Sequence, residues 1–205
     1  VIRGAAELLL AAPDLNDKTR QRLDRIERAA HQCADLTTAL LLLSPMSLYD
    51  VHRAFPQGIS LFYSASFGSI QRALHQLLDA GLVTAEAEPG NPRGKKLHTI
   101  TPAGRQTWAE WMREPVTGGG AETTILARAF FLGLVEDNAE RAAIIATLRQ
   151  RVAAGLAELR AAAEGLDAQV FAAQFAGVFE FQRATLDYGL RSHELALVWL
   201  DELTR

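Results

Sequence analysis

Side chains that can hydrogen-bond to bases or phosphates gather between residues 64 and 75 of the sequence. They are Ser64, Ser66, Ser69, Gln71, Arg72 and His75. The three serines are small, and small hydrogen-bonding residues at the start of a helix let it approach base edges and phosphates in a narrow groove. An ordinary amphipathic surface helix has a similar composition, and the stretch alone favours that simpler interpretation.

A second group of polar residues lies at a turn rich in glycine and proline, with the sequence PGNPRG. The basic residues of this group are Arg93, which lies in the turn, and Lys95 and Lys96, which follow it directly. Such a turn can lie along a phosphate backbone, and a solvated basic turn is the simpler alternative. Because the turn follows soon after the polar helix, DNA contact is the better interpretation.

Residues 66–80 are predicted to form the helix that carries the first group. Ser66 provides the N-cap, and Gly81 stands where a left-handed residue ends a helix. The apolar positions fall on one face, namely Ile70, Leu74, Leu77 and Leu78. The opposite face is polar and is free to meet a ligand.

The neighbouring elements complete a winged helix-turn-helix. A short helix begins at Ser47, and two β-prone runs, residues 82–88 and 95–101, follow the polar helix. Thr101 then caps another helix, with Pro102 at its first position. Counted with the helical segment before Ser47, the order is helix, helix, helix, hairpin, helix. We therefore expect a mainly α protein with a small β-hairpin as its wing.

The C-terminal half is predicted to be a long helical domain. A helix begins at the cap Asn138, breaks at Gly165 and Asp167, and is followed by a second apolar helical segment. A monomeric hairpin could cover part of this apolar surface, and exchange between two copies covers more of it. The expected domains are a helical hairpin over residues 1–38, a winged helix over 39–115 and a helical dimerisation domain over 121–205.

Charge and composition narrow the class of protein further. The 205-residue chain has a formal net charge of −3, and residues 44–105, with six basic and four acidic side chains, are its net-basic part. No apolar run reaches the roughly 18 residues of a membrane span, and no basic region precedes Leu8–Leu10 as in a signal peptide. We expect a cytoplasmic protein.

The single cysteine, Cys33, excludes an intramolecular disulfide and is expected to be a buried structural thiol.

Patterns typical of enzymes are missing from the sequence. The five histidines have no metal-ligand spacing, and no serine lies in a nucleophile elbow. The run GNPRGKK lacks the G-x-x-x-x-G-K-[ST] spacing of a phosphate-binding loop, and a β-turn explains its glycines. We therefore expect no catalytic residue, no metal and no cofactor.

Four runs together resemble the PadR-type transcriptional regulators: PMSLYDVHRAF, YSASFGSIQRALHQLLDAGLVT, KKLHTITPAGRQTWAEWM and ARAFFLGLV. The resemblance extends from about Ala39 to the C-terminus, where FEFQRATLDYGLRSHELALVWLDEL is similar to the last helix of the long members. It implies a homodimeric winged-helix repressor whose C-terminal helices form the dimer and whose operator is palindromic.

Matched by position, the resemblance implies DNA contacts from the serine-rich start of the recognition helix, from the wing, and from Tyr49 of the short helix. Two departures stand out. Leu48 occupies a position where many members have glycine, and Gln71 and Arg72 stand where tyrosine and proline are common. The operator preference of a relative therefore does not transfer to this chain.

The N-terminal segment is similar to a different family. VIRGAAELLLAAPDL and TRQRLDRIERAAHQCADLTTALLLL resemble the dimerisation hairpin of sensor histidine kinases. The phosphoacceptor box of such kinases would precede Val1, and no nucleotide-binding segment follows, so the resemblance implies no kinase activity. A genuine fusion, a fragment and a misplaced gene start all stay open for residues 1–38.

Four aromatic residues near the end of the winged helix are candidates for a ligand pocket. They are Trp108, Trp111, Phe130 and Phe131. They could line a site for an aromatic or amphipathic effector, although aromatic residues at helical spacing are more often core.

A second function also stays open, a helical protein-interaction scaffold whose winged helix has lost DNA binding. The departures at Leu48 and Gln71 keep that alternative open.

Overall fold

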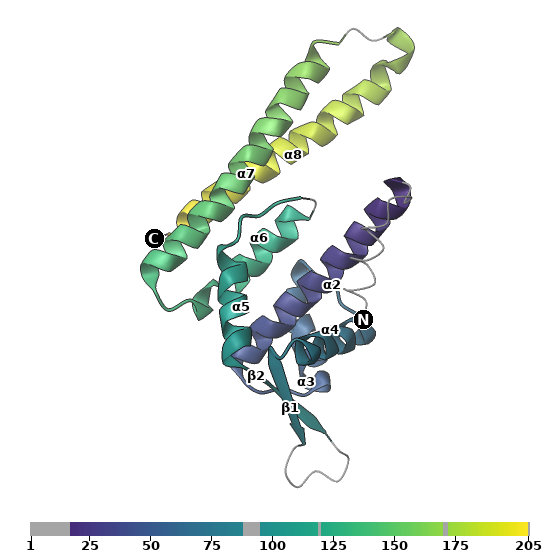
Figure 1. Ribbon diagram of the computed structural model, residues 1–205. Helices are drawn as coiled ribbons and strands as arrows, with labels where there is room; N and C mark the ends of the chain where they lie inside the picture. Colours follow the sequence, from purple (N-terminus) through teal and green to yellow (C-terminus); the bar gives the residue numbers. More distant parts are fainter. Residues whose placement is uncertain (1–16, 88–94, 119, 170–171, 205) are drawn as a thin grey trace. The chain divides into compact units, whose positions relative to one another are not determined.

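The computed structural model describes residues 17–87, 95–118, 120–169 and 172–204 (Figure 1). These residues fall into two compact units. The winged-helix unit contains the described residues up to Met112 together with Leu126–Leu134, and the helical-arm unit contains Arg113–Ile125 together with those from Val135 onward. Among the residues described, no helix is both long enough and sufficiently apolar to span a lipid bilayer.

The winged-helix unit follows the predicted order of elements. These are, in chain order, α2 (Asp17–Leu43), α3 (Leu48–Ala54), the 3₁₀ helices η1 (Phe55–Gln57) and η2 (Ile59–Leu61), α4 (Phe67–Asp79), β1 (Val83–Ala87), β2 (Lys96–Ile100) and α5 (Pro102–Arg113). The predicted fold class, mainly α with a small β-hairpin as the wing, is confirmed.

Local capping signals place the helix ends where the sequence predicts them. Ser47 and Ser66 each accept a hydrogen bond from a backbone N–H in the first turn of α3 and α4. After α4, Gly81 adopts a φ of 69°, a left-handed conformation that glycine adopts without steric cost. Thr101 Oγ1 accepts the Gly104 N–H at 3.1 Å and so caps α5.

An apolar contact between α2 and α4 forms the core of this unit. Its buried residues include Cys33, Leu36 and Leu40 of α2 and Ile70, Ala73, Leu74 and Leu77 of α4. Burial of each leucine or isoleucine side chain contributes about 1.5–3 kcal/mol, so the contact holds α4 firmly. Cys33 is buried, as expected, and burial raises the pKa of its thiol to about 11.

β1 and β2 pair as an antiparallel hairpin. At its base Val83 pairs with Ile100, and both side chains are buried. The segment before α3 adds one bridge to the hairpin, because Met46 and His98 exchange backbone hydrogen bonds of 3.1 and 2.8 Å. The bridge ties the wing to the start of α3.

The first turn of α5 lies against the start of the wing at Gly104. A Cβ atom at this position would overlap the carbonyl oxygen of Leu82 and would lie 2.9 Å from Cγ1 of Ile100. The same Leu82 oxygen accepts the N–H of Thr101 at 3.0 Å. The close approach of α5 to the wing therefore requires glycine at position 104.

After α5 the chain forms α6 (Ala121–Phe130) and η3 (Leu132–Leu134), whose residues are divided between the two units. The helical-arm unit is dominated by the antiparallel pair α7 (Asn138–Asp167) and α8 (Ala176–Glu202), with η4 (Ala173–Phe175) before α8 (Figure 1). Three exposed ion pairs mark its register, namely Arg149–Asp201, Arg160–Glu194 and Arg183–Asp167. Exposed pairs contribute no more than about 1 kcal/mol each, so apolar packing supplies most of the stability.

Two details of the α7 prediction were wrong. The N-cap is Asp137, whose carboxylate accepts the Glu140 N–H at 2.8 Å, and Asn138 is the first helical residue. Asp and Asn cap helices equally well, so two such neighbours leave the sequence ambiguous. The helix also continues through Gly165 before it ends at Asp167. One glycine costs only about 1 kcal/mol in a helix, which the packing of a long helix outweighs.

At the N-terminal side, α2 runs without interruption from Asp17 to Leu43, through the expected domain boundary after residue 38. Residues 1–16 of the hairpin predicted over residues 1–38 lie outside the described residues. The division into three domains and the kinase-like hairpin therefore stay predictions.

Candidate nucleic-acid interface

The first turns of α4 present a connected row of polar side chains. The hydroxyls of Ser66 and Ser69 lie 2.9 Å apart, and Arg72 Nη2 donates a hydrogen bond to Ser69 Oγ at 3.4 Å. Ser64, just before the helix, is exposed, as are Ser66 and Arg72. The row therefore holds the Arg72 guanidinium beside the start of α4, on the surface of the unit.

A groove of about 350 Å³ lies beside this row, between α3, α4 and the base of the wing. Its apolar lining is Leu48, Phe67, Leu74 and Leu78, and its polar lining is Ser47, Tyr49, Gln71, His75, Lys95, Lys96 and His98. Five residues predicted from the sequence to contact DNA thus meet at one groove, although they come from three separate elements. Of the other predicted residues, Arg93 lies outside the described part of the chain.

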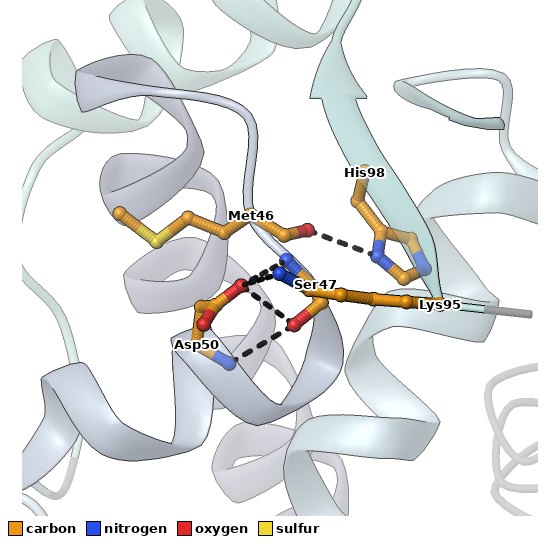
Figure 2. A network of polar contacts seen from close by, with 5 residues as sticks. All are labelled: Met46, Ser47, Asp50, Lys95 and His98. Carbon is orange, nitrogen blue, oxygen red and sulfur yellow. Dashed lines mark hydrogen bonds and ion pairs between the residues drawn. The ribbon is translucent and has the colours of Figure 1, made fainter. Parts of the chain in front are cut away.

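An ion pair joins the base of the wing to α3, as Figure 2 shows. Lys95 Nζ lies 3.2 Å from Asp50 Oδ2. The same oxygen accepts the Ser47 hydroxyl at 2.6 Å and the Ser47 N–H at 3.1 Å. The hydrogen bonds from Ser47, with a smaller contribution from Lys95, hold the pKa of Asp50 below its usual value. Lys95 therefore faces an ionised partner at neutral pH, whereas Lys96 next to it is exposed.

His98 lines the groove but is buried, and its Nδ1 is 3.2 Å from the Met46 carbonyl oxygen (Figure 2). A carbonyl oxygen only accepts, so Nδ1 is the donor. Burial lowers the pKa of His98, the Met46 carbonyl opposes that effect, and the nearby His75 and Lys96 lower the pKa further. His98 is therefore neutral at pH 7 and acts as a structural link between the wing and α3.

Two residues on this face were not predicted from the sequence. Arg53 lies one turn after Tyr49 on α3, and its guanidinium carbon is 5.9 Å from the centre of the Tyr49 ring. The i, i+4 spacing of tyrosine and arginine on a short helix is the signal that could have found it. Phe67, the first residue of α4, lines the groove and is 45% exposed, and nothing in its sequence context marks it as exposed.

The four predicted effector-pocket residues all lie in the winged-helix unit. Trp108 is 7% exposed, and its indole N–H has no hydrogen-bond partner among the described residues. The guanidinium of the buried Arg128 lies 5.1 Å from the centre of the Trp111 ring. Phe130 and Phe131 meet edge to face at 4.9 Å. Trp108, Phe131 and Arg128 are buried in the core of the unit, whereas Phe130 is 48% exposed.

Among known proteins, the chain matches the probable transcriptional regulator Rv1176c of Mycobacterium tuberculosis. The two are 29% identical over 168 residues, a match that covers 76% of this chain and 86% of that protein. The chain is similar to a transcriptional regulator. No family model matches it.

Three solved structures resemble the chain over most of its length. PadR of Bacillus subtilis in complex with operator DNA is 22% identical, with a TM-score of 0.37 and coverage of 83% of this chain and 98% of that chain. The PadR-like regulator BC1756 from Bacillus cereus is 24% identical, with the same TM-score and coverage. The virulence activator AphA of Vibrio cholerae is 20% identical, with a TM-score of 0.37 and coverage of 84% and 95%. At these identities and TM-scores the structures assign neither a ligand nor an activity to this chain.

Proposed function

We propose that the protein is a homodimeric, sequence-specific DNA-binding regulator of transcription that acts as a repressor. In this proposal α4 enters the major groove, the wing contacts phosphates, and the helical arms join two copies. The observation that carries it is the groove at which the polar face of α4 adjoins Tyr49, Lys95 and Lys96. A protein with this function acts on DNA in the cytoplasm and needs no catalytic residue.

The polar face of α4 carries side chains suited to reading bases. Gln71 is exposed, and its amide can bind N6 and N7 of an adenine together. Arg72 is also exposed, and its guanidinium can bind O6 and N7 of a guanine. The small serines before them leave room for the start of the helix to approach the DNA backbone.

Positive charge on the same face supports contact with phosphates. Arg53 of α3 and Lys96 of the wing are exposed, and Lys95, next to Lys96, pairs with Asp50 of α3. Phosphate contacts of this kind supply the sequence-independent part of DNA affinity and make it depend on salt. The relative named as a transcriptional regulator supports the same function, because the match covers 86% of its length.

An exposed apolar stripe on α8 supports the homodimer. Phe181, Tyr188 and Leu195 recur every seven residues and are 73%, 75% and 70% exposed. Val178 and Val198 continue the stripe and are more than half exposed. A seven-residue apolar repeat is the pattern of a seam between helices, and a second copy supplies a matching helix. A two-fold dimer then presents two copies of α4 to the halves of a palindromic site.

The test is fluorescence anisotropy of the purified protein on the DNA upstream of its own gene, against a scrambled duplex, at two salt concentrations. We expect preferential binding that weakens as salt rises. Arg72→Ala should reduce the preference for the cognate duplex by roughly 5- to 150-fold, because it removes a base contact worth about 1–3 kcal/mol. Lys96→Ala should weaken binding to both duplexes alike and lower the salt slope by about one.

Arg149→Ala is the matched control, because Arg149 is an exposed arginine of α7 in the helical-arm unit, outside the apolar stripe of α8. It should leave both affinities unchanged. If the wild-type protein binds neither duplex at low salt, a protein-interaction scaffold without DNA binding becomes the better function.

We also propose that a small aromatic or amphipathic molecule releases the DNA. The support is the buried indole N–H of Trp108, which has no hydrogen-bond partner among the described residues and suits an acceptor group of an aromatic acid. A library of aromatic carboxylic acids should contain a compound that quenches tryptophan fluorescence and weakens operator binding at the same concentration. Quenching without release of DNA would contradict this role.

A further inference from the structure

We infer that Phe67 reads a thymine, by placing its ring against the 5-methyl group in the major groove. The inference rests on the proposed DNA-binding function and names one base that the protein recognises and the residue that recognises it. It assigns a specificity role to a residue outside the polar set that the sequence predicts.

The position of Phe67 leaves part of its ring available to a ligand. It is the first residue of α4, so no preceding turn of that helix lies beneath its side chain, and Phe67 is 45% exposed. Large apolar side chains normally gain stability by burial, and Phe67 is buried only in part. An exposed phenyl ring at the start of a helix that enters DNA is free to contact a base edge.

The ring is held in place before any ligand arrives. His52 of α3 meets Phe67 edge to face, with ring centres 5.4 Å apart and an interplanar angle of 66°. Such aromatic pairs contribute about 0.5–1.5 kcal/mol beyond burial, enough to favour one orientation of the ring. The contact leaves the rest of the ring at the groove, which Phe67 lines together with Gln71 and Lys96.

The chemistry of the major groove selects the partner. Base edges there present donors, acceptors and one apolar group, the thymine 5-methyl, which apolar side chains contact. Phe67 and Gln71 are four residues apart on α4, a rise of about 6 Å along the helix. Base pairs are about 3.4 Å apart, so the two side chains reach base pairs within about two steps of each other. A thymine contacted by Phe67 should therefore lie close to the adenine expected for Gln71.

The test begins with duplexes selected from a random library by the wild-type full-length protein. Each thymine of the selected site is then replaced by deoxyuracil, which removes only the methyl group. We expect one thymine in each half-site whose replacement weakens wild-type binding about 3- to 5-fold, the effect of one buried methyl group. Phe67→Ala should lose the same factor on the thymine duplex and should bind the thymine and uracil duplexes equally.

Two variants separate readout from folding. Phe67→Leu keeps an apolar side chain and should retain the discrimination between thymine and uracil. Leu61→Ala removes a side chain that is 86% exposed in the same unit and does not line the groove, so it should behave as wild type. Thermal melts should show that Phe67→Ala stays folded, and its affinity for random duplex should match that of the wild type.

The outcomes are distinct. If Phe67→Ala keeps the full penalty for uracil, another group contacts the methyl and the inference is overturned. It is also overturned if no thymine in the selected site responds to uracil in the wild type. If the wild type enriches no sequence from the library, the proposed DNA-binding function itself fails.

Discussion

Alanine in place of Gly104 is expected to destabilise the winged-helix unit by about 1–3 kcal/mol, the usual cost of overpacking a filled interior. The added methyl group would meet the Leu82 carbonyl oxygen and the Ile100 side chain. Neither neighbour can move freely, because Leu82 accepts the Thr101 N–H and Ile100 is buried in the hairpin. The wing or α5 must shift, so DNA affinity should fall as well.

Urea unfolding followed by tryptophan fluorescence measures this effect, because Trp108 and Trp111 lie on α5 in the same unit. Gly68→Ala is the matched control. A Cβ atom at Gly68 meets only Ser66 Oγ, at 4.0 Å, so that variant should be as stable as the wild type or up to about 1 kcal/mol more stable. Equal stability of Gly104→Ala and the wild type would show that the contact is not tight.

Glutamate in place of Tyr188 is expected to dissociate the proposed homodimer, weakening self-association about 100-fold. Tyr188 is 75% exposed and stands in the middle of the apolar stripe on α8. A charge at this position would have to be buried without a partner when two copies meet, which costs several kcal/mol. Operator affinity should fall too, because each copy would then bind its half-site alone.

Analytical ultracentrifugation over a range of concentrations measures the association. The control is Gln182→Glu, which adds the same charge at an exposed residue of α8 outside the stripe and should leave the association unchanged. Circular dichroism should show that both variants keep their helices, since neither side chain is buried. A Tyr188→Glu protein that stays dimeric would place the interface elsewhere.

The parts of the fold that could be predicted from the sequence depend on local signals. Ser47, Ser66 and Thr101 cap the helices that follow them, and Gly81 ends α4, because each acts on backbone groups a few residues away. The prediction of the α7 N-cap was wrong because the signal is local: the neighbours Asp137 and Asn138 are equally good capping residues.

Contacts between residues far apart in the sequence could not be predicted in the same way. The pairing of Lys95 with Asp50 depends on the bridge that brings the wing to α3. A count of basic residues therefore treats Lys95 and Lys96 alike, although only Lys95 has a carboxylate partner within the ranges described. The exposure of Phe67 likewise follows from how α3 and α4 meet, and residue type alone suggests burial.

The uninterrupted course of α2 has a mechanical consequence. The helix contains 27 residues, which corresponds to a length of about 40 Å. Its C-terminal part is buried in the core, where Leu36 and Leu40 pack with α4. Its first residue, Asp17, lies several turns away from this contact. An α-helix resists both bending and twisting. A rotation imposed on α2 near Asp17 is therefore transmitted to the part of α2 that packs on α4. A partner bound near Asp17 is thus able to shift α4, the helix proposed to enter the DNA groove.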